Sequence, residues 1–193
     1  SVTLPILRAI ASDQPVGLVH FDAHCDTGDD YLGSKFHHGA PFRRAVEEGL
    51  VDPKRTIQIG IRGSLNDLDQ WKFSHDTGMR VIYMEEFYEM GVKSVIDEIR
   101  RVAGDAPTYL TFDVDGLDPV YAAGTGTPEV GGFSTVEAQL MIRGCQGLNL
   151  IGGDVVEVAP PFDPSGNTAL TGATMMFEVL CVVADAVARR RDE

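Results

Sequence analysis

The chain has 193 residues, with 16 Lys and Arg against 29 Asp and Glu, and a formal net charge of −13. This length suits one domain with a real core. So acidic a surface repels nucleic-acid phosphates and anionic lipid headgroups, so we expect neither nucleic acid nor a membrane as a partner. Cationic ligands, either metal ions or amine and guanidine compounds, are favoured instead.

Two further absences narrow the class of protein. No apolar run approaches the roughly 18 residues that a membrane-spanning helix needs. The three cysteines form no CxxC motif, which argues against a disulfide framework. A reducing compartment, the cytoplasm, is therefore expected.

The apolar pattern predicts helices and strands that alternate along the chain. Helical spacing and capping signals predict helices, whereas short β-branched runs with little alternation predict strands that are buried on both faces. In chain order these are helix 2–11, strand 16–22, helix 41–48, strands 56–62 and 80–84, helix 92–102, strand 109–115, helix 134–144, strand 151–158 and helix 168–190. The order predicts one three-layer α/β domain over residues 1–193 with a mainly parallel sheet.

The first candidate site follows strand 16–22. Asp22, His24 and Asp26 alternate with Ala23 and Cys25, so strand geometry places the three polar side chains on one face and Cys25 on the other, as a small core residue. A solvated, Asp-rich turn is the plain alternative. A histidine between two aspartates directly after a buried strand favours a metal site, at the strand ends where parallel sheets bind ligands.

The second candidate site is Asp113 and Asp115, at the end of strand 109–115. Bringing these carboxylates close to those of the first motif would be costly without cations. Two divalent ions would remove that cost. Oxygen-rich ligation with imidazole suits Mn²⁺, with Ni²⁺, Fe²⁺ or Zn²⁺ as weaker candidates.

Three further segments carry polar groups that the core does not need. His38 precedes a glycine just ahead of helix 41–48, and a Gly/Thr loop at 124–128 lacks the lysine and the spacing of a phosphate-binding loop. Glu157 lies at the end of the last strand, either as a structural acid or as the anchor of a cationic substrate. His20 and His37 are interpreted as structural or supporting residues and receive no role.

The segments DAHCD, HHGAPF, TFDVDGLDP, GTGTPEVGG and GGDVVEVAPP resemble, in order and spacing, the ureohydrolase family of arginases and agmatinases. The segment after Glu157 is closer to agmatinases and guanidinobutyrases than to plain arginases. The resemblance implies an arginase-like fold and hydrolysis of the guanidinium C–N bond of a linear guanidino compound to urea and an amine. Agmatine is the first candidate substrate. Guanidinobutyrate or guanidinopropionate hydrolysis and a catalytically silent family member are the alternatives.

The resemblance also implies a ligand set and an assembly. Asp22 and Asp113 resemble the carboxylates that bridge two Mn²⁺ ions in the family. Asp26 would complete the first ion's site, and His24 and Asp115 the second. Family members form trimers or hexamers, so a homotrimer or homohexamer is expected. A single-zinc deacetylase of the same fold is a rival, against which the paired motifs count.

The remaining roles concern the substrate and its protons. His38 resembles the family's proton-shuttling histidine, and Asp26 would orient the attacking water. Glu157 resembles the carboxylate that holds the guanidinium, and Thr127 lies in a loop that lines the same pocket.

The start of the chain carries one more expectation. In the family, a Gly-Gly-Asp-His motif whose histidine binds the first metal ion immediately precedes a Ser-led helix, and this chain begins at Ser1. We therefore expect a fragment without the N-terminal third, which holds one of the two ions and releases little urea.

Overall fold

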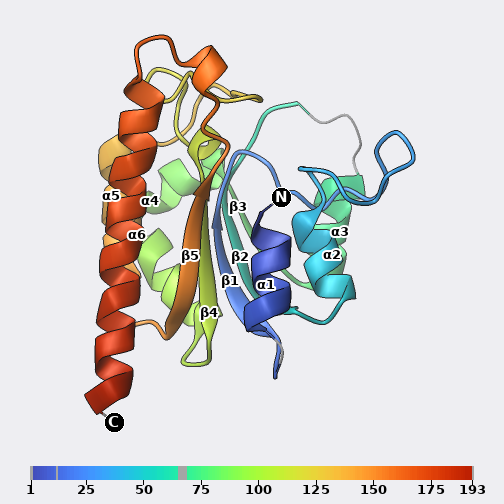
Figure 1. Cartoon of the computed structure of the whole chain (residues 1–193), viewed down its shortest axis with the longest axis vertical. Helices are drawn as coiled ribbons and strands as arrows, with labels where there is room; N and C mark the ends of the chain where they lie inside the picture. The colour runs from blue at the N-terminus through green and yellow to red at the C-terminus, as the bar shows by residue number, and fades with distance from the viewer. Residues whose placement is uncertain (1, 12, 65–68, 193) are drawn as a thin grey trace.

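The computed structural model describes residues 2–11, 13–64 and 69–192, which form three layers around a five-stranded parallel sheet of order β3-β2-β1-β4-β5. Ser1, on which the expected fragment boundary depends, lies outside the described residues. The strands are β1 (Val16–Phe21), β2 (Val51–Ile61), β3 (Arg80–Tyr83), β4 (Thr108–Asp113) and β5 (Leu150–Val156). The predicted three-layer α/β class is confirmed (Figure 1).

Helices cover both faces of this sheet. One face carries α1 (Thr3–Ile10), α2 (Pro41–Glu47) and α3 (Asp69–Thr77), and the other carries α4 (Met84–Ala103), α5 (Thr135–Gly144) and α6 (Asn167–Asp192) (Figure 1). The predicted capping box is present at α5, because the Ser134 hydroxyl accepts from the Glu137 backbone N–H and the Glu137 carboxylate accepts from that of Ser134. Each contact satisfies a backbone donor that the first helical turn leaves free.

The register of the central strands brings three strand ends to one level. β1 lies between β2 and β4, and all six of its residues are buried. Phe21 pairs with Phe112, and Asp113 pairs with Val156. The residues that follow β1, β4 and β5 therefore emerge side by side at the carboxyl edge of the sheet, where ligands of α/β proteins bind.

The structure corrects some predicted boundaries. β2 begins at Val51 rather than at 56, and the polar helix α3 was not predicted. The helix expected at 92–102 begins at Met84, because α4 continues across a kink at Gly91, where φ is 72°. Glycine adopts this conformation at little cost, and it interrupts the apolar spacing by which a helix is recognised.

The two predicted site strands are shorter than expected. β1 ends at Phe21, so Asp22, His24 and Asp26 lie in the connection after it, and the argument from strand alternation was wrong for them. β4 ends at Asp113, whose side chain accepts from the Asp115 N–H and closes a short 3-10 turn. Side-chain hydrogen bonds of this kind compete with the sheet ladder and end a strand.

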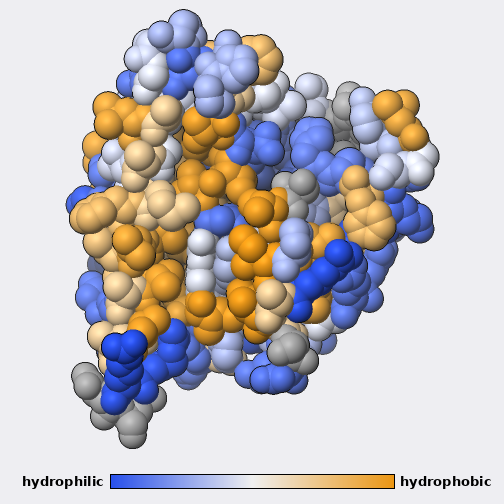
Figure 2. Space-filling view, viewed as in Figure 1, coloured by the Kyte–Doolittle hydropathy of each residue, from blue (hydrophilic) through white to orange (hydrophobic). Residues whose placement is uncertain are grey.

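Helix α6 is the one helix of the described residues that bears on the expectation about membranes. Over 25 residues it is long and apolar enough, by length and composition, to cross a membrane, although 33% of its most apolar window is buried in the molecule. A helix that packs on a sheet passes the same test, so one such helix is weak evidence. Figure 2 shows hydrophobic residues gathered along α6 and β5. The large exposed hydrophobic side chains of α6 are Leu170, Met176, Phe177 and Leu180.

Candidate metal centre

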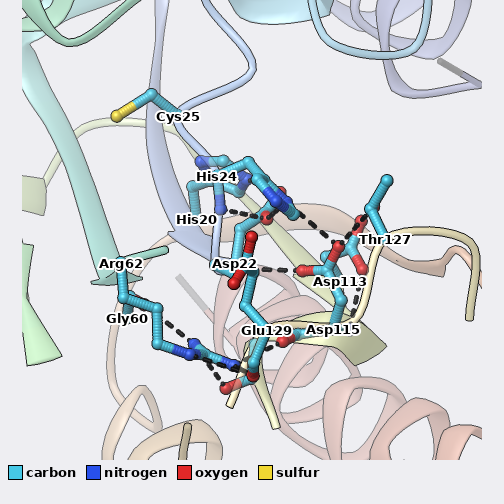
Figure 3. Close-up of polar contacts among 12 residues, drawn as sticks. His20, Asp22, His24, Cys25, Gly60, Arg62, Asp113, Asp115, Thr127 and Glu129 are labelled. Carbon is cyan, nitrogen blue, oxygen red and sulfur yellow. Dashed lines mark hydrogen bonds and ion pairs between the residues drawn. The ribbon is translucent and has the colours of Figure 1, made fainter. Parts of the chain in front are cut away.

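Buried acids and one histidine meet where β1 and β4 end. Asp22, Asp113 and Asp115 are 2%, 3% and 2% exposed. His24 Nδ1 lies 3.3 Å from Asp22 Oδ1 and 3.1 Å from Asp115 Oδ2, so the imidazole connects the two motifs (Figure 3). Segments that are about 90 residues apart in the chain thus share one cluster, as parallel strand ends at a common edge allow.

Three of these residues are close enough to hold one ion. One potential ligand atom from each of Asp22, His24 and Asp115 lies within 4.8 Å of the others. Asp113 stands beside them and accepts the Asp115 N–H through Oδ1 at 2.9 Å. The assignment of Asp22 and Asp113 as the bridging pair stays a prediction.

The electrostatics of the cluster call for a cation. Burial raises the pKa of Asp22 and Asp113 well above the ordinary carboxyl range, and the charge of Asp115 raises both further. Burial opposes ionisation of Asp115 too, but contacts from His24 hold its pKa low. Burial disfavours the charged form of His24, yet its bonds to Asp115 and Asp22 raise its pKa to about 11. A metal ligand must be a neutral imidazole or an ionised carboxylate, so a divalent ion would replace the protons that this oxygen-rich donor set otherwise holds.

Behind Asp22 lies a pair of buried residues to which the sequence analysis gave no site role. His20 Nε2 lies 2.7 Å from Asp22 Oδ2, and Gln58 Nε2 lies 3.1 Å from His20 Nδ1. Burial lowers the pKa of His20 to about 4. The available signal was two polar side chains, His20 and Gln58, at matched positions of two buried strands, since they are partners in the β1–β2 register.

Arg62, at the end of β2, was also missed. It is 7% exposed, and its guanidinium donates to main-chain carbonyls rather than to carboxylates (Figure 3). The acceptors are the carbonyls of Gly60, Asp115, Gly116, Leu117, Glu129 and Val130. Arg62 therefore ties the turn that carries Asp115 to the loop that carries Thr127. No sequence motif marked it, because an isolated arginine after a strand is common.

Gly60 lets these segments approach. Its φ is +105°, and a Cβ atom there would lie 2.6 Å from the Phe133 ring and 2.8 Å from the Asp22 carbonyl oxygen. Real Cβ contacts are longer, and only glycine adopts this backbone conformation without strain. The close approach of β2 to the chain after β1 therefore requires glycine.

A cavity of about 380 Å³ opens above the cluster. Every predicted site residue except the deeper Asp22 lines it, together with residues that were not predicted. The predicted residues are His24, Asp26, His38, Asp113, Asp115, Thr127 and Glu157, and the others are Tyr31, His37, Gly39, Ser64, Pro128 and Glu129. No Lys or Arg of the described ranges lines it.

The remaining predicted site residues, which include the metal-ligand candidate Asp26, are held differently from Asp22, His24, Asp113 and Asp115. Asp26 and Glu157 have positive φ of 52° and 65°, which is uncommon outside glycine and concentrates at functional sites. Thr127 donates to Asp115 Oδ2 at 3.2 Å. His38 is exposed in the loop before α2. Cys25 points away from the cluster and is buried beside Ile61, as predicted (Figure 3).

Comparisons with known proteins agree with this geometry. Residues 1–182 match the model of the arginase family. The chain is 59% identical over 189 residues to a guanidinopropionase of Pseudomonas aeruginosa, covering 97% of this chain and 59% of that protein. It is 54% identical to a mitochondrial agmatinase of Gallus gallus, over 95% of this chain and 54% of the relative.

A solved structure extends the likeness to the backbone. The proclavaminate amidino hydrolase of Streptomyces clavuligerus superposes with a TM-score of 0.92 at 39% identity, over 96% of this chain and 62% of that one. The chain spans less than two thirds of the length of these relatives. The buried acid cluster, the matching family model and the shared backbone together show that this chain belongs to the arginase family.

Proposed function

We propose that this chain provides the catalytic centre of a ureohydrolase, which cleaves the guanidinium C–N bond of a linear guanidino compound to urea and an amine. The observation that carries the proposal is the Asp22, His24 and Asp115 cluster, buried at the floor of an acidic cavity. Relatives named as guanidinopropionase and agmatinase support the reaction class.

The resident cations are proposed to be two Mn²⁺ ions, with Ni²⁺ as the alternative. Asp22 and Asp113 would bridge them, Asp26 would complete one site, and His24 and Asp115 would complete the other. Carboxylate oxygens with one imidazole suit Mn²⁺ better than softer metals. Two such metal ions would lower the pKa of water and so supply a nucleophile at neutral pH.

The chain's own groups would do the remaining work. Glu157 can bind the planar guanidinium through two parallel hydrogen bonds, which orients its carbon toward the cluster. Asp26 accepts a hydrogen bond from the attacking water and so directs it. His38, which lines the cavity, would donate a proton to the leaving amine as the general acid.

The cavity favours agmatine over a guanidino acid. Its described lining holds Asp26, Glu129 and Glu157 in addition to the cluster, and no Lys or Arg. This charge attracts a substrate that carries an amine at its far end, whereas a guanidino acid needs a cation for its carboxylate. Guanidinopropionate stays the second candidate, because the guanidinopropionase shares 59% identity.

A urea-release panel tests the proposal. The full-length protein is loaded with Mn²⁺ and assayed against agmatine, guanidinobutyrate, guanidinopropionate, arginine and guanidine, with Asp113→Ala as the blank. We expect urea from agmatine first. Faster turnover of a guanidino acid would reverse the substrate assignment. Mn²⁺ binding without urea from any substrate would identify a catalytically silent family member.

A further inference from the structure

Two buried side chains behind the metal-ligand candidates form a directed chain of hydrogen bonds. We propose that His20 is a positioning residue that carries its proton on Nε2 and thereby fixes the carboxylate of Asp22 for a metal ion. The metal part of this inference rests on the proposed function. His20 lies on β1, is 1% exposed, and has both ring nitrogens within hydrogen-bond distance of a partner.

The orientation of Gln58 sets the direction of the chain. Its Nε2 lies 2.6 Å from the Cys25 carbonyl oxygen, which can only accept, so the nitrogen and not the oxygen of the amide must face it. The same Nε2 lies 3.1 Å from His20 Nδ1. An amide nitrogen only donates, so Nδ1 must accept with its lone pair. A flipped amide would set two oxygens against each other.

The ring proton is therefore on Nε2, where it meets Asp22. His20 Nε2 lies 2.7 Å from Asp22 Oδ2, and it donates to that oxygen. The other oxygen, Oδ1, accepts from the His24 backbone N–H at 2.6 Å. Both oxygens are held by fixed donors, and each keeps a lone pair for a cation. A ligand oriented in this way binds metal more tightly than one that is free to rotate.

Packing keeps the imidazole in place. The ring of Phe42, on α2, stacks at a tilt with its centroid 4.3 Å from that of His20. Because Nδ1 is occupied by Gln58 and Nε2 by Asp22, neither nitrogen is left to bind an ion. His20 therefore acts through Asp22 and is distinct from His24, which lies in the cluster itself.

Nuclear magnetic resonance of the histidine rings tests the tautomer directly. In protein labelled with ¹⁵N at histidine, the nitrogen shifts distinguish a protonated ring nitrogen from an unprotonated one. We expect a proton on Nε2 of His20 and none on Nδ1. Gln58→Glu should add a proton at Nδ1 while Nε2 keeps its own, because a carboxylate accepts rather than donates and Asp22 still accepts from Nε2. A proton on Nδ1 in the unmodified chain overturns the proposal.

Metal affinity tests the positioning role. His20→Leu should weaken Mn²⁺ binding by about tenfold to a hundredfold, the usual effect of losing a partner of a metal ligand. His20→Gln keeps an N–H donor near the position of Nε2 and should recover most of the affinity. Calorimetric titration of both variants, with His75→Gln as an exposed control, measures this.

The outcomes separate the two hypotheses. Equal Mn²⁺ affinity in His20→Leu and the unmodified chain would overturn the positioning role. Equal loss in His20→Gln and His20→Leu would show that the ring matters only for packing, which also overturns it. Failure of the unmodified chain to bind Mn²⁺ would overturn the proposed function, and the ring spectrum would still decide the tautomer.

Discussion

The bottom and the side of the cavity are built in different ways. The floor, formed by Asp22, His24, Asp113 and Asp115, is a network in which each side chain bonds to another member or to its backbone. The wall, formed by His38 and Glu157, is more exposed and lies on a loop and at a strained strand end. Both regions line the same cavity, except Asp22, which lies deeper.

This difference separates the tasks of the two regions. The metal-ligand candidates of the floor are bonded to one another, so their side chains have little freedom to move. This suits metal ions that require a fixed geometry. A wall with fewer internal bonds keeps its polar groups available for a substrate. Substitutions in the floor should therefore abolish metal binding, and substitutions in the wall should change turnover or substrate affinity alone.

The largest expected effect comes from the floor. Asp113→Ala should remove bound Mn²⁺ and lower urea release by about a thousandfold or more, since metal ions supply several kcal/mol of transition-state stabilisation. Metal analysis by mass spectrometry and the urea assay measure this. Asp105→Ala, which removes an exposed carboxylate, is the matched control. Two tightly held ions in Asp113→Ala would refute its assignment as a bridging ligand.

The next effect comes from the wall. His38→Ala should lower kcat by about a hundredfold or more, the usual contribution of a general acid, while bound Mn²⁺ stays constant. His75→Ala is the control, because His75 is exposed and lies outside the cavity lining. A changed metal content in His38→Ala would make His38 a ligand instead. Unchanged turnover would assign the proton transfer to His37 or to solvent.

A third substitution sharpens the comparison within the wall. Glu157→Gln should raise KM for agmatine by about tenfold to a hundredfold, because a hydrogen bond to a charged group is worth about 1.5–3 kcal/mol. Metal content should not change. Glu89→Gln, at an exposed position of α4 outside the cavity lining, is the control. Loss of Mn²⁺ in Glu157→Gln would contradict the division between floor and wall.

The smallest expected effect is on stability without metal. Burial raises the pKa of Asp22, Asp26 and Asp113. The native state therefore keeps protons that the unfolded chain has released, so stability falls as pH rises above the ordinary carboxyl pKa of about 4 toward the raised native values. In EDTA, Asp26→Asn should melt at a higher temperature than the unmodified chain at pH 7. Thermal unfolding followed by circular dichroism measures it.

Glu98, a carboxylate outside the site, has its pKa shifted in the opposite direction. The hydrogen bond from Arg101, aided by Arg80, lowers the pKa of Glu98 to about 2. The stabilisation from ionised Glu98 is present above the pKa that Glu98 has in the unfolded chain, and it disappears as pH falls toward about 2. Glu98→Gln should therefore lower the melting temperature slightly at pH 7. If Asp26→Asn also lowered the melting temperature at pH 7, burial of the Asp26 carboxyl would not destabilise the native state, and the preceding prediction would be wrong.

The sequence predicted the three-layer class, most strand and helix positions, and the gathering of polar residues at the carboxyl ends of the strands. It predicted these because buried parallel strands have a recognisable composition and their carboxyl ends share an edge. It could not predict where β1 and β4 stop, since the hydrogen bonds that end them involve side chains such as Asp113. His20 was interpreted as a structural or supporting residue without a named partner, and Arg62 was missed. The partners of both include distant segments, and no local pattern shows which partner a buried polar group meets.

The glycine at position 60 has a consequence for how sequence change should be interpreted. Glycine has no side chain with which to contact a candidate ligand. A methyl group at this position would nevertheless clash with both the Phe133 ring and the backbone of Asp22. In a library of random variants selected for urea release, position 60 should accept as few replacements as the acids themselves. Low mutational tolerance would thus mark a position where two segments approach too closely for a side chain. Such a position would be mistaken for one that takes part in the chemistry.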